Sequence, residues 1–277
     1  MNVSWQCPLT LSGCVLAAML ATSVQGQAPP PAPTPSPSTT AQQLAKEALN
    51  PFSQYVKVPL ESVTGFRVGS SKKTGENVNI EPVLPFSVGA QWNIIVQPLL
   101  AMEYLPGPNA TTGLQDLQTS VFLTPERTGA WIWGVGPIVE VPTATSTQLG
   151  TGKWSAGPTG AVVYSQGPWL NGVLVSHLAS FAGNPDRPSV RVTSIESQVS
   201  YTFADGWYIQ NNPTITYDWN AAAWTVPVGA DVGKALTIGD QALSLQVGAY
   251  DLVVRPEGDP VWIIRVSVTL LFPTGAR

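Results

Sequence analysis

The sequence predicts an all-β fold, a transmembrane antiparallel up-and-down β-barrel of about twelve strands, and three observations support this prediction. Gly and Pro are abundant, with 25 and 26 residues among 277, which disfavours long helices. Charged residues make up only 11% of the chain although the hydrophobic share is an ordinary 44%. Most of the chain alternates between apolar and polar residues in segments long enough to cross a membrane as strands.

The charge balance excludes several classes of protein. Thirteen Lys and Arg against seventeen Asp and Glu give a net charge of -4. A basic nucleic-acid binder is therefore excluded, and we expect no nucleic-acid partner. The low charge also excludes a highly charged disordered chain and a coiled coil.

The first 26 residues are typical of a signal peptide. An apolar run at 15–21 is followed by the small-residue pattern Val24-Gln25-Gly26, although the segment contains no Lys or Arg. A competing interpretation is a lipoprotein cleavage box at 11–14, but the apolar run follows Cys14 instead of preceding it. We expect export, with the cell outer membrane as the destination.

The domain organisation follows from composition. Residues 27–40 are a Pro-rich disordered linker, and 41–62 contain a short helix, AQQLAKEAL, and the segment that leads into the barrel. The predicted barrel occupies 63–277. Both cysteines, Cys7 and Cys14, lie in the signal peptide, so a Cys-based metal site or nucleophile is excluded from the mature protein.

The barrel prediction rests on twelve alternating segments separated by Gly, Pro, Asn or Asp. Their approximate cores are 63–69, 77–87, 91–104, 114–124, 130–142, 153–165, 169–181, 189–203, 207–219, 224–236, 241–254 and 260–272.

The third and last segments indicate which face contacts lipid. Both carry one face that is aliphatic in the middle and aromatic at the ends, which is typical of a lipid-facing strand between interfacial girdles. A β-sandwich gives the same period, but it does not place aromatics so regularly at strand ends. The lipid faces are Trp92, Ile94, Val96, Pro98, Leu100, Met102 and Tyr104 in the third segment, and Trp262, Ile264, Val266, Val268, Leu270 and Phe272 in the last.

The connections agree with this topology. Short turns at 88–90, 167–168, 204–206 and 239–240 alternate with longer loops near 70–76, 105–113, 143–152, 182–188 and 255–259. An even number of strands returns both ends to the periplasm, with the longer loops outside. Phe272 provides the C-terminal strand signal.

The face opposite the aromatics supplies the candidate lumen residues. Acidic residues exceed basic ones there by six to three, and such an excess favours cations or neutral polar solutes. Alternatively, these side chains pair across the lumen and only fill it. The candidates are Arg67, Glu81, Gln97, Glu103, Asp116, Gln118, Glu140, Lys153, Glu196, Gln198, Gln210, Asn212, Asp231, Gln246, Tyr250 and Arg265.

The chain offers little for catalysis. Its one histidine, His177, lies next to Ser176, but adjacent strand residues point to opposite faces, and Ser180 also lies on the other face. A nucleophile would have to come from another strand, and no nucleophile-elbow motif accompanies the histidine. No metal cluster, phosphate loop or dinucleotide fingerprint is present. We therefore expect neither enzymatic activity nor a cofactor.

Five long strings of the sequence are distinctive: NPFSQYVKVPLES (50–62), WIWGVGPIVEVPTATSTQLGTGKWSAGPTGAVV (131–163), SHLASFAGNPDRPSV (176–190), WTVPVGADVGKALTIGDQALSLQVGAY (224–250) and WIIRVSVTLLFP (262–273). They resemble a family of bacterial outer-membrane proteins named as transporters, and the similarity spans roughly 50–273. This family is related to proteins of the meta-pathway of phenol degradation, and its members are sometimes misnamed neuromedin U. The resemblance implies uptake of small organic compounds and supplies no binding residues.

Together these observations predict a porin-like outer-membrane channel of a Gram-negative bacterium that takes up small organic molecules or cations passively. Its expected partners are outer-membrane lipid, the barrel-assembly machinery and an unidentified small-molecule solute. A structural barrel with a plugged lumen is the alternative, and an outer-membrane hydrolase is the third possibility.

Overall fold

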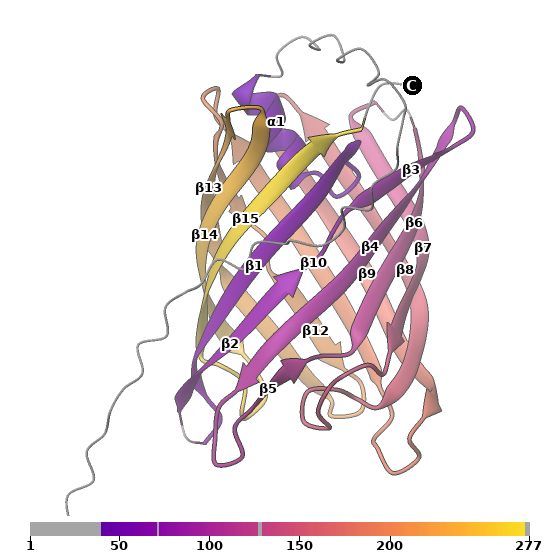
Figure 1. Cartoon of the computed structure of the whole chain (residues 1–277), viewed down its shortest axis with the longest axis vertical. Helices are drawn as coiled ribbons and strands as arrows, with labels where there is room; N and C mark the ends of the chain where they lie inside the picture. Colours follow the sequence, from indigo (N-terminus) through magenta and orange to yellow (C-terminus); the bar gives the residue numbers. More distant parts are fainter. Residues whose placement is uncertain (1–39, 71, 127–128, 275–277) are drawn as a thin grey trace, which may run out of the picture. The chain divides into compact units, whose positions relative to one another are not determined.

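One closed antiparallel sheet forms a β-barrel in the computed structural model, which describes residues 40–70, 72–126 and 129–274 (Figure 1). The sheet has fifteen strand segments. Three pairs of consecutive segments, β2 with β3, β5 with β6 and β11 with β12, each make one strand of the wall, so that twelve strands surround the lumen. The predicted fold class is confirmed. The predicted signal peptide and the linker up to residue 39 lie outside the described residues.

The helix is α1 (Ala41–Leu49). The strands are β1 (Tyr55–Val68), β2 (Lys73–Ile80), β3 (Leu84–Val88), β4 (Trp92–Leu105), β5 (Thr111–Leu114), β6 (Leu117–Pro125), β7 (Trp131–Val141), β8 (Lys153–Gln166), β9 (Trp169–Gly183), β10 (Arg191–Thr202), β11 (Trp207–Asn211), β12 (Thr214–Asp218), β13 (Ala223–Ile238), β14 (Gln241–Val254) and β15 (Trp262–Pro273).

The barrel closes where its first and last strands meet. β1 pairs with β15 from Tyr55 opposite Pro273 to Phe66 opposite Trp262. The first strand therefore begins at Tyr55 rather than at residue 63, because the leading segment continues the alternation and pairs with the last strand. Phe272 lies in this seam opposite Val56 and is 40% exposed.

Proline explains two of the three interruptions in the wall. Pro82 between β2 and β3 and Pro213 between β11 and β12 have no N–H to donate to a neighbouring strand. The pairing of β10 keeps one register across β11 and β12. The third interruption, between β5 and β6, shifts the pairing with β4 by one residue.

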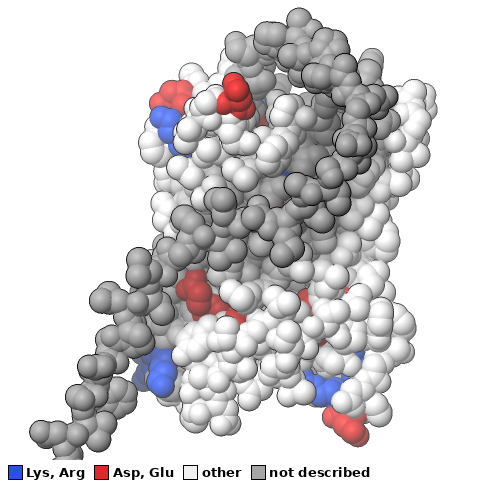
Figure 2. Space-filling view, viewed as in Figure 1, with Lys and Arg blue, Asp and Glu red and all other residues white. Residues whose placement is uncertain are grey.

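The exterior of the barrel is apolar and the inner face is polar. Leu100, Val247 and Val266 each expose about half of their surface, whereas Asn93 and Gln210 on the other face are buried. Every tryptophan among the described residues is exposed. Most of the described surface in view is white, and Lys and Arg are in view only toward the two ends (Figure 2). Such an inverted distribution belongs to a barrel that is surrounded by lipid, as in the outer membrane.

Exposed tryptophans mark both membrane interfaces. Strands that enter the barrel after a short turn begin with Trp92, Trp131, Trp169 or Trp207, and the opposite end carries Trp154, Trp219, Trp224 and Trp262.

The connections place the two sides of the membrane. Those at one end are short, such as 167–168 and 239–240, and those at the other end include the long loop 142–152. Outer-membrane barrels turn their short connections to the periplasm, so α1 and the end of β15 lie on the periplasmic side (Figure 1). Among the described residues, no helix combines the length and hydropathy that a membrane span requires.

The two faces predict opposite responses to an added charge. Val266→Arg puts a cation on the lipid face and should destabilise the refolded barrel by roughly 2–4 kcal/mol. Gln118→Arg puts the same side chain on the inner face opposite Glu140, where the carboxylate can pair with it, and should cost much less. Urea unfolding of both variants in lipid vesicles measures the difference, and equal destabilisation would contradict the assigned faces.

Candidate functional site

A helical plug occupies the periplasmic end of the barrel. We use this term for residues 40–54, which comprise α1 and the turn after it. Thr40 and Gln43 form a capping box, because the Thr40 hydroxyl accepts from the Gln43 N–H and the Gln43 side chain accepts from the Thr40 N–H. The cap fixes the first turn of a helix too short to be stable alone.

The apolar side of α1 packs against the inner wall. Leu44 and Ala45 are buried in a cluster with Tyr208 of β11, Ala235 of β13 and Leu271 of β15. The plug therefore lies inside the barrel, against strands from its second half.

Three wall side chains hold the C-terminal end of the plug helix. The last carbonyls of a helix have no partner within it. The Lys57 ammonium donates to the carbonyls of Ala48 and Asn50 at 3.2 and 2.6 Å. Gln198 Nε2 donates to the Leu49 carbonyl at 3.1 Å. Because Lys57 is only 5% exposed, its charge is compensated by these carbonyls and by the negative end of the helix dipole.

The third of these side chains, Gln97 on β4, reaches the turn that follows the helix. Its amide donates to the Pro51 carbonyl at 3.2 Å. The plug is thus anchored to β1 and β4, which are separated by a single strand of the wall, and to β10, which lies across the lumen from them.

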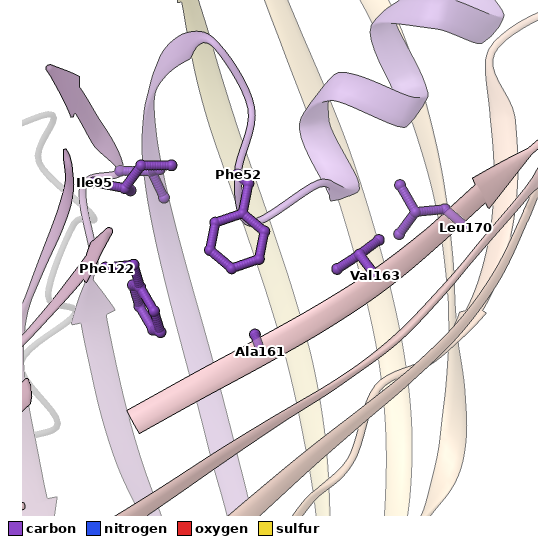
Figure 3. Packing of buried hydrophobic residues seen from close by; sticks show 7 residues of the cluster. Phe52, Ile95, Phe122, Ala161, Val163 and Leu170 are labelled. Carbon is purple, nitrogen blue, oxygen red and sulfur yellow. The ribbon is translucent and has the colours of Figure 1, made fainter. Parts of the chain in front are cut away.

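Phe52 anchors the same turn through apolar contacts. Its ring packs at 84° to Phe122, with a centroid separation of 5.6 Å. Ile95 and Val163 belong to the same buried cluster (Figure 3). Gly134 on β7 leaves room for the ring, because a Cβ there would lie 2.6 Å from it.

Further contacts fix the plug at the rim. Gln42 donates to the Thr202 carbonyl at 2.9 Å, and Lys46 donates to the Gly167 carbonyl at 3.0 Å. Beside the plug, an open cleft of about 520 Å³ lies at the periplasmic ends of β6 and β7, lined by Glu47, Phe52, Gln54, Thr124, Glu126 and Ile132 among others.

A polar network covers the inner wall of β11 to β15. Its centre is the ion pair between Arg265 and the fully buried Asp231, whose closest atoms are 2.6 Å apart. Tyr250 donates its hydroxyl to Asp231 at 2.5 Å and lies under the Arg265 guanidinium, 4.3 Å from ring centroid to Cζ. A second group lies beside it, in which Gln210 donates to Gln246 at 3.0 Å. These four strands are therefore held by paired groups.

Three carboxylates face one another near the middle of the barrel. Glu81 lies between β2 and β3, and its charge interacts with Glu61 on β1 and Glu196 on β10. Asn212, with its amide nitrogen turned toward its acceptors, reaches Glu196 Oε1 at 3.2 Å. Glu81 is exposed although it lies on the inner face, so the lumen beside it is open space.

The acidic residues near the outer end have a different role. Asp116 accepts from the Ala144 and Thr151 N–H groups at 3.0 and 2.6 Å and so holds the loop 142–152. Glu140 accepts from the hydroxyls of Thr151 and Ser155, each at 3.2 Å.

Lys153 and Glu103 are also engaged near this end. Lys153 donates to the Asn184 carbonyl at 2.6 Å, and Glu103 accepts from Gln115 at 2.6 Å. These two side chains, like Asp116 and Glu140, secure the ends of the strands and the loops.

The structure places one candidate away from the lumen. Arg67 was assigned to the inner face from the alternation of β1. The register of β1 shifts between Gly65 and Val68, and Arg67 adopts a left-handed backbone with φ of 61°. Its exposed side chain lines an outer pocket between two hairpins, because the extra residue ends the alternation.

His177 lies on the outer face, in register with Thr193 of β10. Its Nδ1 is 2.9 Å from the Thr193 hydroxyl, which also accepts from the Trp219 indole at 2.9 Å. The hydrogen-bond partner of His177 therefore comes from another strand and is a threonine. Among the described residues, no group of three or more His, Cys, Asp or Glu could hold a metal ion.

Sequence reasoning missed Lys57 and Glu61. Both lie in the part of β1 before residue 63, which we expected to precede the barrel. The alternation of Lys57, Pro59 and Glu61 with Val58 and Leu60 is the signal that extends the strand backward.

Comparison with known proteins supports the fold. No family model matches the chain, and no curated protein matches it. The COG4313 outer membrane channel from Pseudomonas putida F1 superposes with a TM-score of 0.59 at 14% identity, over 79% of this chain and 96% of that one. The NanC porin superposes with a TM-score of 0.51 at 11% identity, over 79% and 100%. The identity is low, so these matches show that the chain shares its fold with the two outer-membrane channels and nothing beyond the fold.

The Asp231–Arg265 pair gives a prediction about stability. Asp231→Asn leaves the Arg265 charge without its buried partner and should destabilise the barrel by about 3–5 kcal/mol. Adding Arg265→Gln should recover part of this loss. A double-mutant cycle from urea unfolding measures the coupling, and strictly additive effects would argue against a direct interaction.

Proposed function

We propose that the chain is an outer-membrane channel through which small molecules pass passively, rather than an enzyme. The observation that carries this proposal is the inward-facing yet exposed Glu81, which requires space at the middle of a polar lumen. The shared fold with two outer-membrane channels supports the same function.

The chemistry of the lumen indicates the class of solute. Glu61, Glu81 and Glu196 outnumber the two cations whose charges interact with them, Lys57 and Arg265, and Arg265 also pairs with Asp231. An excess of carboxylates in a narrow polar pore favours cations and neutral polar molecules over anions. The resemblance to proteins of the meta-pathway of phenol degradation suggests small organic compounds among the neutral solutes.

This selectivity has a direct electrical test. Glu81→Gln with Glu196→Gln should move the reversal potential toward zero across a salt gradient in planar bilayers. The effect should be largest near 0.01 M salt, where the Debye length is about 30 Å, and fade near 1 M, where it is about 3 Å. Asp240→Asn in the exposed β13–β14 turn removes a charge outside the lumen and serves as the control. A conducting pore whose reversal potential ignores the two substitutions would refute this role of the acidic residues.

A structural barrel with a closed lumen is the second candidate. The anchoring of the plug to Lys57, Gln97 and Gln198 favours it, because so many contacts keep the helix in place. Under the channel proposal, the cleft of about 520 Å³ beside the plug is the solute's route to the periplasm.

Loosening the plug separates the two candidates. Lys57→Met removes two hydrogen bonds to the helix end and should raise the single-channel conductance of the refolded protein severalfold. Lys46→Met removes a rim contact but leaves the C-terminal anchors intact, so it should have little effect. A wild-type protein and a Lys57→Met variant that are both silent in bilayers would support the structural barrel instead.

A further inference from the structure

A pocket of about 570 Å³ lies at the outer end of the barrel between the β1–β2 and β14–β15 hairpins. The two hairpins are joined by a hydrogen bond from the Gly69 N–H to the Gly258 carbonyl at 2.9 Å. A second bond, from the Val261 N–H to the Phe66 carbonyl, is also 2.9 Å long. The walls of the pocket are therefore fixed relative to each other.

Basic residues concentrate around this pocket. Arg67, Lys72 and Arg255 line it, and Lys73 follows directly in the sequence. These four are drawn from only thirteen basic residues in the chain. Basic side chains are in view at the lower end of the barrel in Figure 2, where Figure 1 places the β1–β2 hairpin. Such clustering is unusual for a chain with so little charge.

Two of these cations lack an internal partner. Within the described ranges, neither Arg67 nor Lys72 forms an ion pair or a side-chain hydrogen bond. Lys153 at the start of β8 and Arg187 in the β9–β10 loop do donate to backbone carbonyls. Arg67 and Lys72 also have left-handed backbones, with φ of 61° and 51°, which cost free energy for residues other than Gly. Their charges are thus available to an external anion.

The pocket lies at the level of lipid headgroups. Just inside it, Phe66 and Trp262 stack on the outer face with ring centroids 3.9 Å apart, and aromatic residues of this kind mark the interface. Val253 and Val254 line the pocket and are 54% and 49% exposed. A ligand seated there meets apolar surface on one side and cations on the other.

The acidic residues of the pocket leave a positive balance. Glu257 and Asp259 also line it, and one oxygen of Asp259 accepts from the Thr225 hydroxyl at 3.3 Å. Three basic and two acidic residues give the lining a charge of +1. Beside the lining, Lys73 is basic and two residues are acidic: Glu76, which accepts from the hydroxyls of Ser62 and Thr64, and Asp251, which lies opposite Trp262. The whole chain, in contrast, carries -4.

We propose that this pocket binds the phosphate headgroup of a lipid in the outer leaflet, with Arg67 and Lys72 as the main contacts. The acyl chains would lie along Val253 and the Phe66–Trp262 stack. A free inorganic anion would make no such apolar contact. This site is independent of the proposed transport, because it lies on the outer surface.

The test compares two double variants of the refolded full chain in detergent. Arg67→Gln with Lys72→Gln removes two charges from the pocket. Arg191→Gln with Lys234→Gln removes two outward charges that lie over Trp219 and Trp207 instead. Binding of a phosphorylated lipid A is measured by native mass spectrometry. We expect roughly tenfold or greater weakening in the pocket variant and less than twofold in the control.

Three results would overturn the proposal. Equal weakening in both variants would indicate general attraction to charge. If dephosphorylated lipid A bound as tightly as the phosphorylated form, the pocket would not recognise the phosphate. Competition by millimolar inorganic phosphate would identify a free anion as the ligand.

A folding control keeps the test decisive. The heat-dependent shift of the barrel on gel electrophoresis shows whether each variant folds. If the double variant does not fold, Lys72→Gln alone should weaken binding, and Lys72→Arg should restore it because the charge is kept.

Discussion

The ammonium group of Lys57 determines how the inside of this barrel is arranged. It is buried in the lumen, and its partners are the carbonyls at the end of α1. A buried cation and an uncapped helix end are each unfavourable alone, and here each satisfies the other. The position of the helix follows from this contact. Phe52, two residues after the last of these carbonyls, then packs against Ile95 and Phe122.

The fold could be predicted because lipid imposes a simple rule on every strand. The alternation of Trp92, Val96 and Leu100 with Asn93 and Gln97 required lipid on one side and a polar interior on the other. The start of β1 was harder to place, since Pro59 and a preceding helical pattern disguise a strand that pairs fully with β15. Strand breaks at Pro82 and Pro213 leave the register of the wall unchanged and therefore did not disturb the prediction.

The arrangement inside the lumen could be predicted only in part. Alternation assigns a face but not a partner. It therefore selects Gln97 and Asp231 without revealing that one binds the plug and the other binds Arg265. Arg67 was misplaced because a one-residue bulge ends the alternation. The fit of Phe52 against Gly134 joins residues far apart in the sequence, and no local pattern encodes such a contact.

The short link between α1 and β1 makes the helix a tethered ligand of its own barrel. Residues 50–54 span at most about 17 Å when extended, and the Thr274 hydroxyl also binds the Gln54 carbonyl at 2.6 Å. When α1 dissociates from the inner wall, the short link keeps it at an effective concentration on the order of millimolar relative to its binding site there. Its return is therefore an intramolecular step whose rate does not depend on how much protein the membrane contains. An added peptide of the same sequence would compete at a large disadvantage.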